Sequence, residues 1–149
     1  VERNKFTNIV ISNLVTGCTT LFNEELAQIA LPIPGNAIMH DWWLALTASV
    51  FGRVIFIDMP LVEYRQHQNN TIGAKEFTKA QVSSHTWFRF LTLSVSSHLV
   101  DVAEQASEFQ RRFGKTLGFK HNFFLKIVIM MKFRLGGFQR LFYRIARLF

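Results

Sequence analysis

The sequence predicts an α/β protein, with part of a sheet covered by helices and a mainly helical C-terminal region after it. Two apolar runs rich in β-branched residues, 9–22 and 53–58, have strand propensity. Between them, residues 41–51 are almost wholly apolar and have the length of a buried helix. Strand, helix and strand in this order favour an α/β body. We expect its sheet to continue beyond what this chain supplies.

The composition indicates a folded chain with a real core. It has 149 residues, of which 49% are hydrophobic and 16 are Phe, and few chains of this composition are disordered. The first residue is Val1 and no signal-peptide pattern follows, so we interpret the chain as a piece of a longer protein. The single Cys18 excludes an internal disulfide and fits a reducing compartment.

Charge divides the chain into a mildly acidic body and a basic tail. Residues 1–110 carry 7 Lys and Arg against 10 Asp and Glu, a net charge of −3. Residues 111–149 carry 10 Lys and Arg and no acidic residue, a net charge of +10. We therefore expect the two parts to have different roles.

The first elements are expected in this order. The extended run 9–22 is broken near Asn13 and at Thr16-Gly17. Asn23 is a favourable N-cap for a helix over residues 24–30, whose two acidic residues lie in the first turn. Two prolines and a glycine then predict a loop over residues 34–39.

The helix that begins at His40-Asp41 carries the candidate catalytic group. Asp41 is expected in its first turn, where unpaired backbone N–H groups and the helix dipole favour a carboxylate. The residues that follow leave no polar face before Gly52, so the helix should be buried on most sides. Such a helix would hold a catalytic base in a fixed position. The alternative, favoured by these residues alone, is that Asp41 caps a core helix.

After Gly52 the pattern changes from apolar to polar. We expect a strand over 53–58, a short extended run over 61–64, and a polar loop over 65–70. A helix is expected over residues 75–112, ended by Gly114 and Gly118. Its apolar positions keep a spacing of three and four: Leu91, Val95, Leu99, Val102, Ala106 and Phe109.

The basic tail has two apolar pieces. The first, residues 123–133, has a longest uncharged run of Ile127–Met131, far short of the roughly 20 residues of a spanning helix. The second, residues 138–149, has an apolar face and an arginine face, which fits a helix on an anionic membrane surface. A helix docked on its own domain fits equally well. Nucleic acid is disfavoured, because the apolar face is too continuous for a phosphate-binding arm.

Three motifs together resemble the C-terminal half of bacterial family 2 glycosyltransferases, rhamnosyltransferase-like members above all. They are Val15-Thr16-Gly17-Cys18-Thr19-Thr20-Leu21-Phe22-Asn23, His40-Asp41-Trp42-Trp43, and Tyr64-Arg65-Gln66-His67-Gln68-Asn69-Asn70 with Gly73. The resemblance covers about residues 8–75. It implies part of a GT-A fold over residues 1–75, with a helical extension over 76–118 and a basic amphipathic tail over 119–149.

The resemblance also implies roles for the motif residues. Asp41 lies where such inverting enzymes keep the general base that takes the acceptor proton. His67 lies near the position of a histidine directed towards a divalent metal, Mn²⁺ or Mg²⁺, or the diphosphate. Without the family, His67 reads as a hydrogen-bonding loop residue. Arg65 would pair with the diphosphate, or with Asp58 or Glu63 in a structural ion pair.

The remaining candidates would line the sugar site. Gly17 and Cys18 would lie beside donor sugar and acceptor, with Gly17 permitting close backbone approach, and His40 would contact substrate. Trp42 or Trp43 would offer an aromatic face to a sugar, although core packing is favoured for at least one of them.

One departure from the family limits this interpretation. The chain has no DxD motif to hold the metal, and its nearest acidic neighbours are Glu24-Glu25, in the predicted helix. We therefore interpret the chain as the acceptor and catalytic-base half of a transferase, inactive as an isolated piece.

The resemblance implies transfer of a sugar such as rhamnose from a nucleotide diphosphate sugar to a lipid-linked or polysaccharide acceptor in cell-surface polysaccharide biosynthesis. The enzyme would act in the cytoplasm, peripherally at the inner face of the plasma membrane. The alternative function is a non-catalytic membrane-surface or protein-binding module that uses the basic tail.

Overall fold

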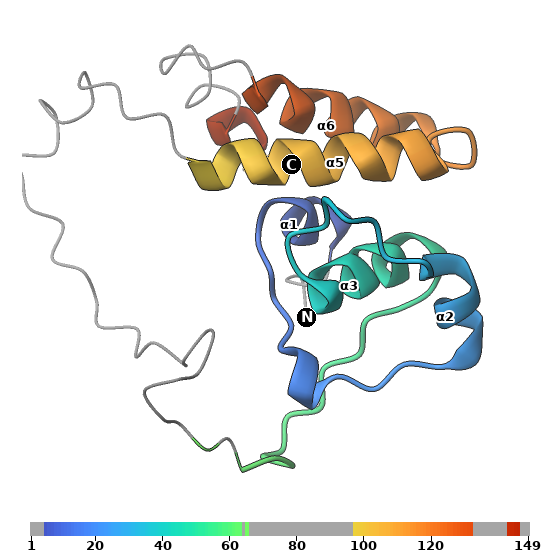
Figure 1. Cartoon of the computed structure of the whole chain (residues 1–149), viewed down its shortest axis with the longest axis vertical. Coiled ribbons are helices and arrows are strands. Elements are labelled where there is room, and N and C mark those ends of the chain that lie inside the picture. Colours follow the sequence, from blue (N-terminus) through green and yellow to red (C-terminus); the bar gives the residue numbers. More distant parts are fainter. Residues whose placement is uncertain (1–4, 64, 66–96, 133–142, 147–149) are drawn as a thin grey trace, which may run out of the picture.

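The computed structural model describes residues 5–63, 65, 97–132 and 143–146, and within them the fold is entirely helical (Figure 1). The elements are α1 (Phe6–Ile11), the 3₁₀ turn η2 (Gly17–Thr19), α2 (Glu24–Ala30), α3 (His40–Phe51), α5 (Ser97–Phe113), α6 (Phe119–Ile129) and the 3₁₀ turn η3 (Met130–Lys132). A helical turn over residues 143–146 follows.

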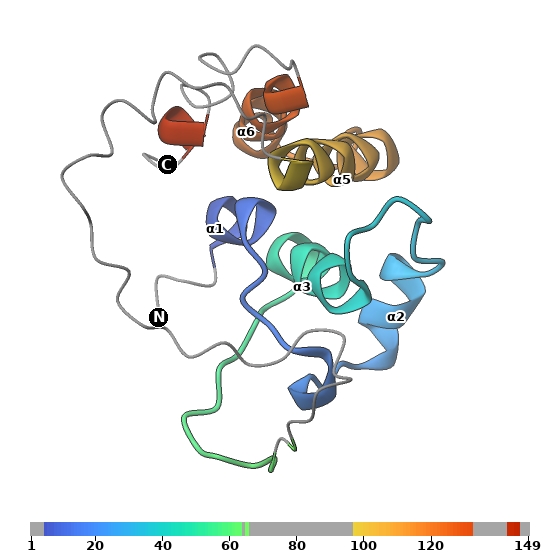
Figure 2. The same ribbon diagram turned by 60° about the vertical axis from the view of Figure 1, so that its left-hand side comes forward.

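The helices form two groups around one apolar core. Figures 1 and 2 show α5 and α6 side by side, with α1, α2 and α3 packed beneath them. The short α1 contacts α3, α5 and α6, and so joins the groups. Buried residues from Phe6 to Ala146 belong to this core. The core therefore includes parts of the three regions expected from the sequence, 1–75, 76–118 and 119–149.

The predicted α/β class, and with it the partial GT-A fold, is wrong for this structure. No strand occurs in the described part of the chain. The β-branched residues at 9–11 lie in α1 and are buried there, because packing against three helices overrides a weak strand propensity. Residues 53–58 form no regular element, and Ile55 and Phe56 are 79% and 77% exposed. A strand needs a partner, and the described residues provide none.

The predicted start of α2 is confirmed. Asn23 is its N-cap, and the side-chain oxygen of Asn23 accepts the backbone N–H of Leu26 at 3.3 Å. Glu24 and Glu25 lie in the first turn, as expected.

At the C-terminal end of α2, the side chain of Arg112 from α5 binds backbone carbonyl oxygens. The guanidinium of Arg112 donates to four consecutive carbonyl oxygens, those of Ile29, Ala30, Leu31 and Pro32. These oxygens include helix-end acceptors that have no partner within α2. Arg112 therefore joins α5 to the C-terminal end of α2 by hydrogen bonds to backbone carbonyl oxygens.

The prediction of a buried helix that starts at His40-Asp41 and stops before Gly52 is confirmed by α3. Residues 41–48 are all buried. The indole N–H of Trp42 donates to the carbonyl oxygen of Ile9, and that of Trp43 donates to the carbonyl oxygen of Ala30 at 3.0 Å. Both buried indoles thus have the acceptor that they need, and they join α3 to α1 and α2.

The predicted apolar face of the long helix is confirmed where α5 is described. Val102, Ala106 and Phe109 are buried, Leu99 is half-buried, and Leu91 and Val95 lie outside the described residues. The ring of Phe109 lies 5.4 Å from that of Trp43 and 4.8 Å from that of Phe113, between centroids. The helix ends before Gly114, as predicted.

Helix α6 continues this packing with Phe124, Leu125 and Val128, which are all buried. No helix in the described part of the chain combines the length and the apolar character needed to cross a bilayer. This agrees with the short uncharged run seen in the sequence. The predicted tail helix 138–149 lies outside the described residues, apart from the helical residues 143–146.

Candidate active site around Asp41

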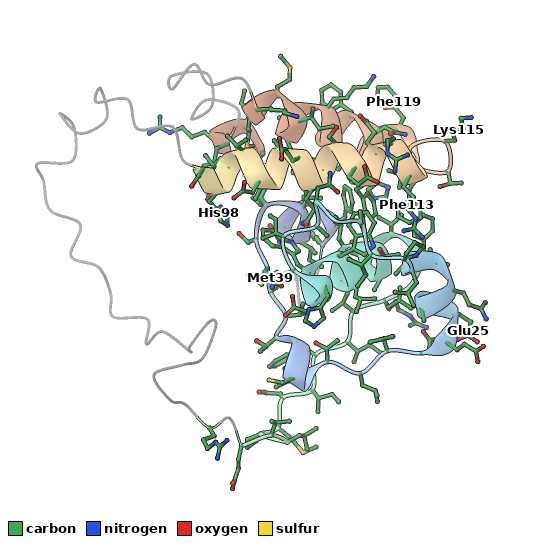
Figure 3. The ribbon with its side chains drawn as sticks, in the orientation of Figure 1. Glu25, Met39, His98, Phe113, Lys115 and Phe119 are labelled. Atoms are coloured by element: carbon green, nitrogen blue, oxygen red, sulfur yellow. The ribbon has the colours of Figure 1, made fainter. Side chains whose placement is uncertain are left out.

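The carboxylate of Asp41 lies in the first turn of α3, as predicted, and is 7% exposed. Its Oδ1 accepts the backbone N–H of Trp42 at 2.7 Å and the side-chain amide of Asn13 at 3.2 Å. The first bond satisfies an N–H of the first turn that has no partner within the helix. Asp41 therefore stabilises the first turn of α3, as a capping residue would, although the N-cap position itself is Met39. Figure 3 labels Met39 at this end of α3.

Asn13 fixes the carboxylate from a loop that is distant in sequence. Its Oδ1 accepts the backbone N–H of Val15 at 3.1 Å, in an Asx turn. Its Nδ2 donates to Asp41 and also contacts the Sδ of Met39 at 3.6 Å. Because the oxygen and the nitrogen of the amide have different partners, the amide has one orientation.

Sequence reasoning did not identify Asn13 as a site residue. The available signal was an Asn at a break between two apolar runs, where an Asx turn is common. Nothing in that signal points to Asp41, which is 28 residues away along the chain.

The loop at Gly17 passes directly over His40 and Asp41. A Cβ added to Gly17 would lie 2.8 Å from Nε2 of His40 and 3.4 Å from Oδ2 of Asp41. The first distance is shorter than van der Waals contact allows, so glycine permits the loop to approach this closely. Three predicted site residues, Gly17, His40 and Asp41, are thus brought together by the fold.

The second carboxylate oxygen of Asp41 is the chemically open group. Both hydrogen bonds go to Oδ1, and Oδ2 has no hydrogen-bond partner among the described residues. His40 beside it is exposed and Gly17 is half-buried, so this corner of the site is at the surface. A fixed carboxylate with one free oxygen at a surface can accept a proton from a bound hydroxyl.

The two tryptophans are core residues. Trp42 and Trp43 are 1% and 0% exposed, so core packing is confirmed for both. The imidazole of His98, from the first turn of α5, stacks on Trp42 with centroids 6.1 Å apart and planes at 25°. In this structure neither indole offers a free face to a sugar.

The other predicted site residues are less constrained. Cys18 is an exposed free thiol next to Gly17 in η2. Arg65 is exposed and has an interaction partner, while His67 lies outside the described residues. The diphosphate contact of Arg65 and the metal contact of His67 therefore stay predictions.

The described residues do not form a metal centre. They contain no group of three His, Cys, Asp or Glu side chains close enough to hold an ion. The Mn²⁺ or Mg²⁺ that the resemblance implies would be held by His67, outside the described residues, and mainly by a half of the enzyme that this chain lacks. It therefore stays a prediction, and we derive no catalytic step through it.

Comparisons with known proteins add no assignment. No protein-family model matches the chain, no curated protein matches it, and no solved structure matches it. The likeness to family 2 glycosyltransferases rests on the three sequence motifs alone.

Proposed function

We propose that this chain supplies the acceptor side of a glycosyl-transfer site, with Asp41 as the general base. One observation carries the proposal. The Gly17 loop and the first turn of α3, two motifs that are distant in sequence, meet so that Gly17 lies beside His40 and Oδ2 of Asp41. A fixed carboxylate with one free oxygen, next to residues from two sequence motifs, indicates a functional site more specifically than a carboxylate alone.

The chemistry requires one proton acceptor. An acceptor hydroxyl attacks the anomeric carbon of the donor sugar, and its oxygen forms the new glycosidic bond. Oδ2 of Asp41 takes the hydroxyl proton as the bond between the anomeric carbon and the diphosphate oxygen breaks, and the nucleoside diphosphate leaves with that electron pair. Asn13 and the N–H of Trp42 hold Oδ1, so the free oxygen is positioned before the substrate binds.

The substrate class follows from the motif resemblance. It favours a nucleotide diphosphate sugar, such as one carrying rhamnose, and a lipid-linked or polysaccharide acceptor of cell-surface polysaccharide biosynthesis. The exposed His40, beside the open oxygen, is the residue best placed to contact an acceptor hydroxyl. The divalent metal stays a prediction of the resemblance, as does the inactivity of the isolated chain.

A binding experiment tests the acceptor side without the donor. Saturation-transfer NMR of the 149-residue chain with short saccharides ending in rhamnose, glucose or N-acetylglucosamine should show binding of at least one of them. Gly17→Phe fills the space above Oδ2 and should abolish the signal. The matched control is Gly35→Phe, because a Cβ at Gly35 meets nothing within 4 Å.

Two outcomes would overturn the proposal. One is the absence of binding by every saccharide of the panel. The other is an equal loss of binding in the Gly17 and Gly35 variants, with both folded by circular dichroism.

The alternative function is a membrane-surface or protein-binding module built on the basic tail. Most of residues 138–149 lies outside the described residues, so this role of the tail stays a prediction. It does not conflict with a carboxylate site in the body of the chain.

A further inference from the structure

Gln105 is a polar residue on the buried face of α5. It is 1% exposed, and it shares this face with the apolar residues Val102, Ala106 and Phe109. Burying a side-chain amide among apolar groups costs free energy unless hydrogen bonds replace those that water made. The hydrogen bonds of Gln105 therefore decide what the residue contributes.

The side-chain amide of Gln105 is only half satisfied. Its Oε1 accepts the backbone N–H of Ile38 at 3.0 Å. Its Nε2 is buried and has no hydrogen-bond partner in the described part of the chain. The gain from the one bond is opposed by the cost of the unpaired donor, which is at least as large. The stability of the core by itself therefore does not explain a glutamine at this position.

The bond to Ile38 acts on the segment that leads into α3. Ile38 belongs to the loop between α2 and α3, which lies against α5 in Figures 1 and 2. The next residue, Met39, is the N-cap of α3. The Sδ of Met39 contacts the side-chain amide of Asn13 at 3.6 Å, and the same amide donates to Asp41. Gln105, 67 residues from Ile38 along the chain, thus holds the segment directly before Asp41.

We propose that Gln105 is a positioning residue of the carboxylate site, and that its buried amide sets the start of α3. Asn13 fixes Oδ1 of Asp41 directly, whereas Gln105 fixes the backbone from which Asp41 extends. Departures from full hydrogen bonding in a core are expected above all at functional sites. An acceptor hydroxyl must meet Oδ2 at hydrogen-bond distance, so a small displacement of this backbone weakens the site. This inference rests on the function proposed for Asp41 and adds a residue to it.

Two substitutions separate positioning from stability. Gln105→Met keeps the unbranched length and the helix propensity of glutamine, but removes both the bond and the unpaired donor. Its melting temperature should stay within about 3 °C of that of the parent, because these two effects oppose each other. Gln105→Glu keeps an oxygen for the N–H of Ile38 but buries a carboxylate. It should therefore be less stable than the parent and leave the site in place.

Hydrogen exchange and NMR report the geometry of the site without a ligand. In Gln105→Met, the backbone N–H of Trp42, which binds Oδ1 of Asp41, should exchange roughly fivefold faster or more. The side-chain amide signals of Asn13 should shift as well. In Gln105→Glu, both readouts should resemble those of the parent, since the acceptor for Ile38 is kept.

A second glutamine of α5 provides the matched control. The amide of Gln110 donates to the backbone and side-chain oxygens of Asn122 at 3.2 and 3.3 Å, away from the loop before α3. Gln110→Met should therefore leave the exchange of Trp42 and the signals of Asn13 unchanged.

Saccharide binding separates this inference from the function on which it rests. Where the parent chain binds a saccharide ending in rhamnose, glucose or N-acetylglucosamine, Gln105→Met should lower the affinity roughly 10-fold, and Gln105→Glu should retain it. If the parent binds none of them, the function proposed for Asp41 fails. The exchange of Trp42 and the signals of Asn13 then decide by themselves whether Gln105 positions Asp41.

Four results would overturn the positioning role. They are unchanged exchange of Trp42 and unchanged Asn13 signals in Gln105→Met, the same changes in Gln110→Met, the same changes in both Gln105 variants, and a large drop in the melting temperature of Gln105→Met. The last result would show that Gln105 serves the stability of the core.

Discussion

The side-chain amide of Asn13 donates to Oδ1 of Asp41 at 3.2 Å, and thereby fixes a carboxylate at the start of α3 from a loop that precedes it by 28 residues. The Trp42 N–H binds the same oxygen at 2.7 Å. Both donors leave Oδ2 open beneath Gly17. The predictions below test this arrangement and the contacts that support it.

In a complete enzyme that contains this chain, Asp41→Asn should reduce sugar transfer by roughly 100-fold or more, because an amide cannot take the acceptor proton. The amide oxygen can still accept the N–H of Trp42, so the fold should persist. Turnover with a nucleotide diphosphate sugar and thermal unfolding are the measurements. Unchanged turnover with a lower melting temperature would show that Asp41 only stabilises the start of α3.

Asn13→Ala should lower the free energy of unfolding by about 2 kcal/mol, since it removes a hydrogen bond to a buried carboxylate. Asn13→Asp keeps the acceptor of the Asx turn but places a second carboxylate beside Asp41. Its destabilisation should therefore exceed that of Asn13→Ala, because two like charges repel each other at close range. Urea unfolding at neutral pH measures both variants. Equal stability of Asn13→Asp and the parent at neutral pH would contradict the bond.

Gly17→Ala should change the free energy of unfolding by less than about 1 kcal/mol, because the new methyl group meets the far end of the exposed His40 side chain. It should instead displace the imidazole of His40, which NMR of its ring protons detects. Gly35→Ala, in open space, is the control and should leave these signals in place. A large loss of stability in Gly17→Ala would mean that the loop cannot adjust.

Arg112→Lys should cost about 2 kcal/mol of unfolding free energy. A guanidinium can donate to several acceptors at once, whereas an ammonium cannot reproduce bonds to four carbonyl oxygens. Arg111→Lys is the matched control, because the side chain of Arg111 is 73% exposed and, within the described part of the chain, pairs only with Glu108. Denaturant unfolding of both variants decides the point, and equal losses would refute the special role of Arg112.

The Glu108–Arg111 pair predicts a small pH effect. Hydrogen bonds from Arg111 lower the pKa of Glu108 in the folded chain. A lowered pKa contributes stability that is present above the ordinary pKa of Glu and is lost as the pH falls through the lowered value. Glu108→Gln should therefore be slightly less stable than the parent at neutral pH and equal to it in strong acid. Thermal unfolding across this pH range measures the difference.

The sequence by itself determined the elements whose signals are local. Asn23 before two acidic residues fixed the start of α2, and His40 to Gly52 fixed the limits of α3 with Asp41 in its first turn. The spacing of Val102, Ala106 and Phe109 likewise gave the buried face of α5. Caps, breaks and periodicity depend on neighbours along the chain, and these are visible without a fold.

Only the tertiary structure decided the state of α1, of residues 53–58 and of the candidate site. The β-branched residues of α1 are helical because three helices bury them, and the apolar residues at 53–58 form no strand because the described residues offer no strand to pair with. The contact of Asn13 with Asp41, and the Gly17 loop above it, join segments that are distant in sequence. Such contacts depend on how the helices pack against one another, and local sequence patterns do not predict that packing.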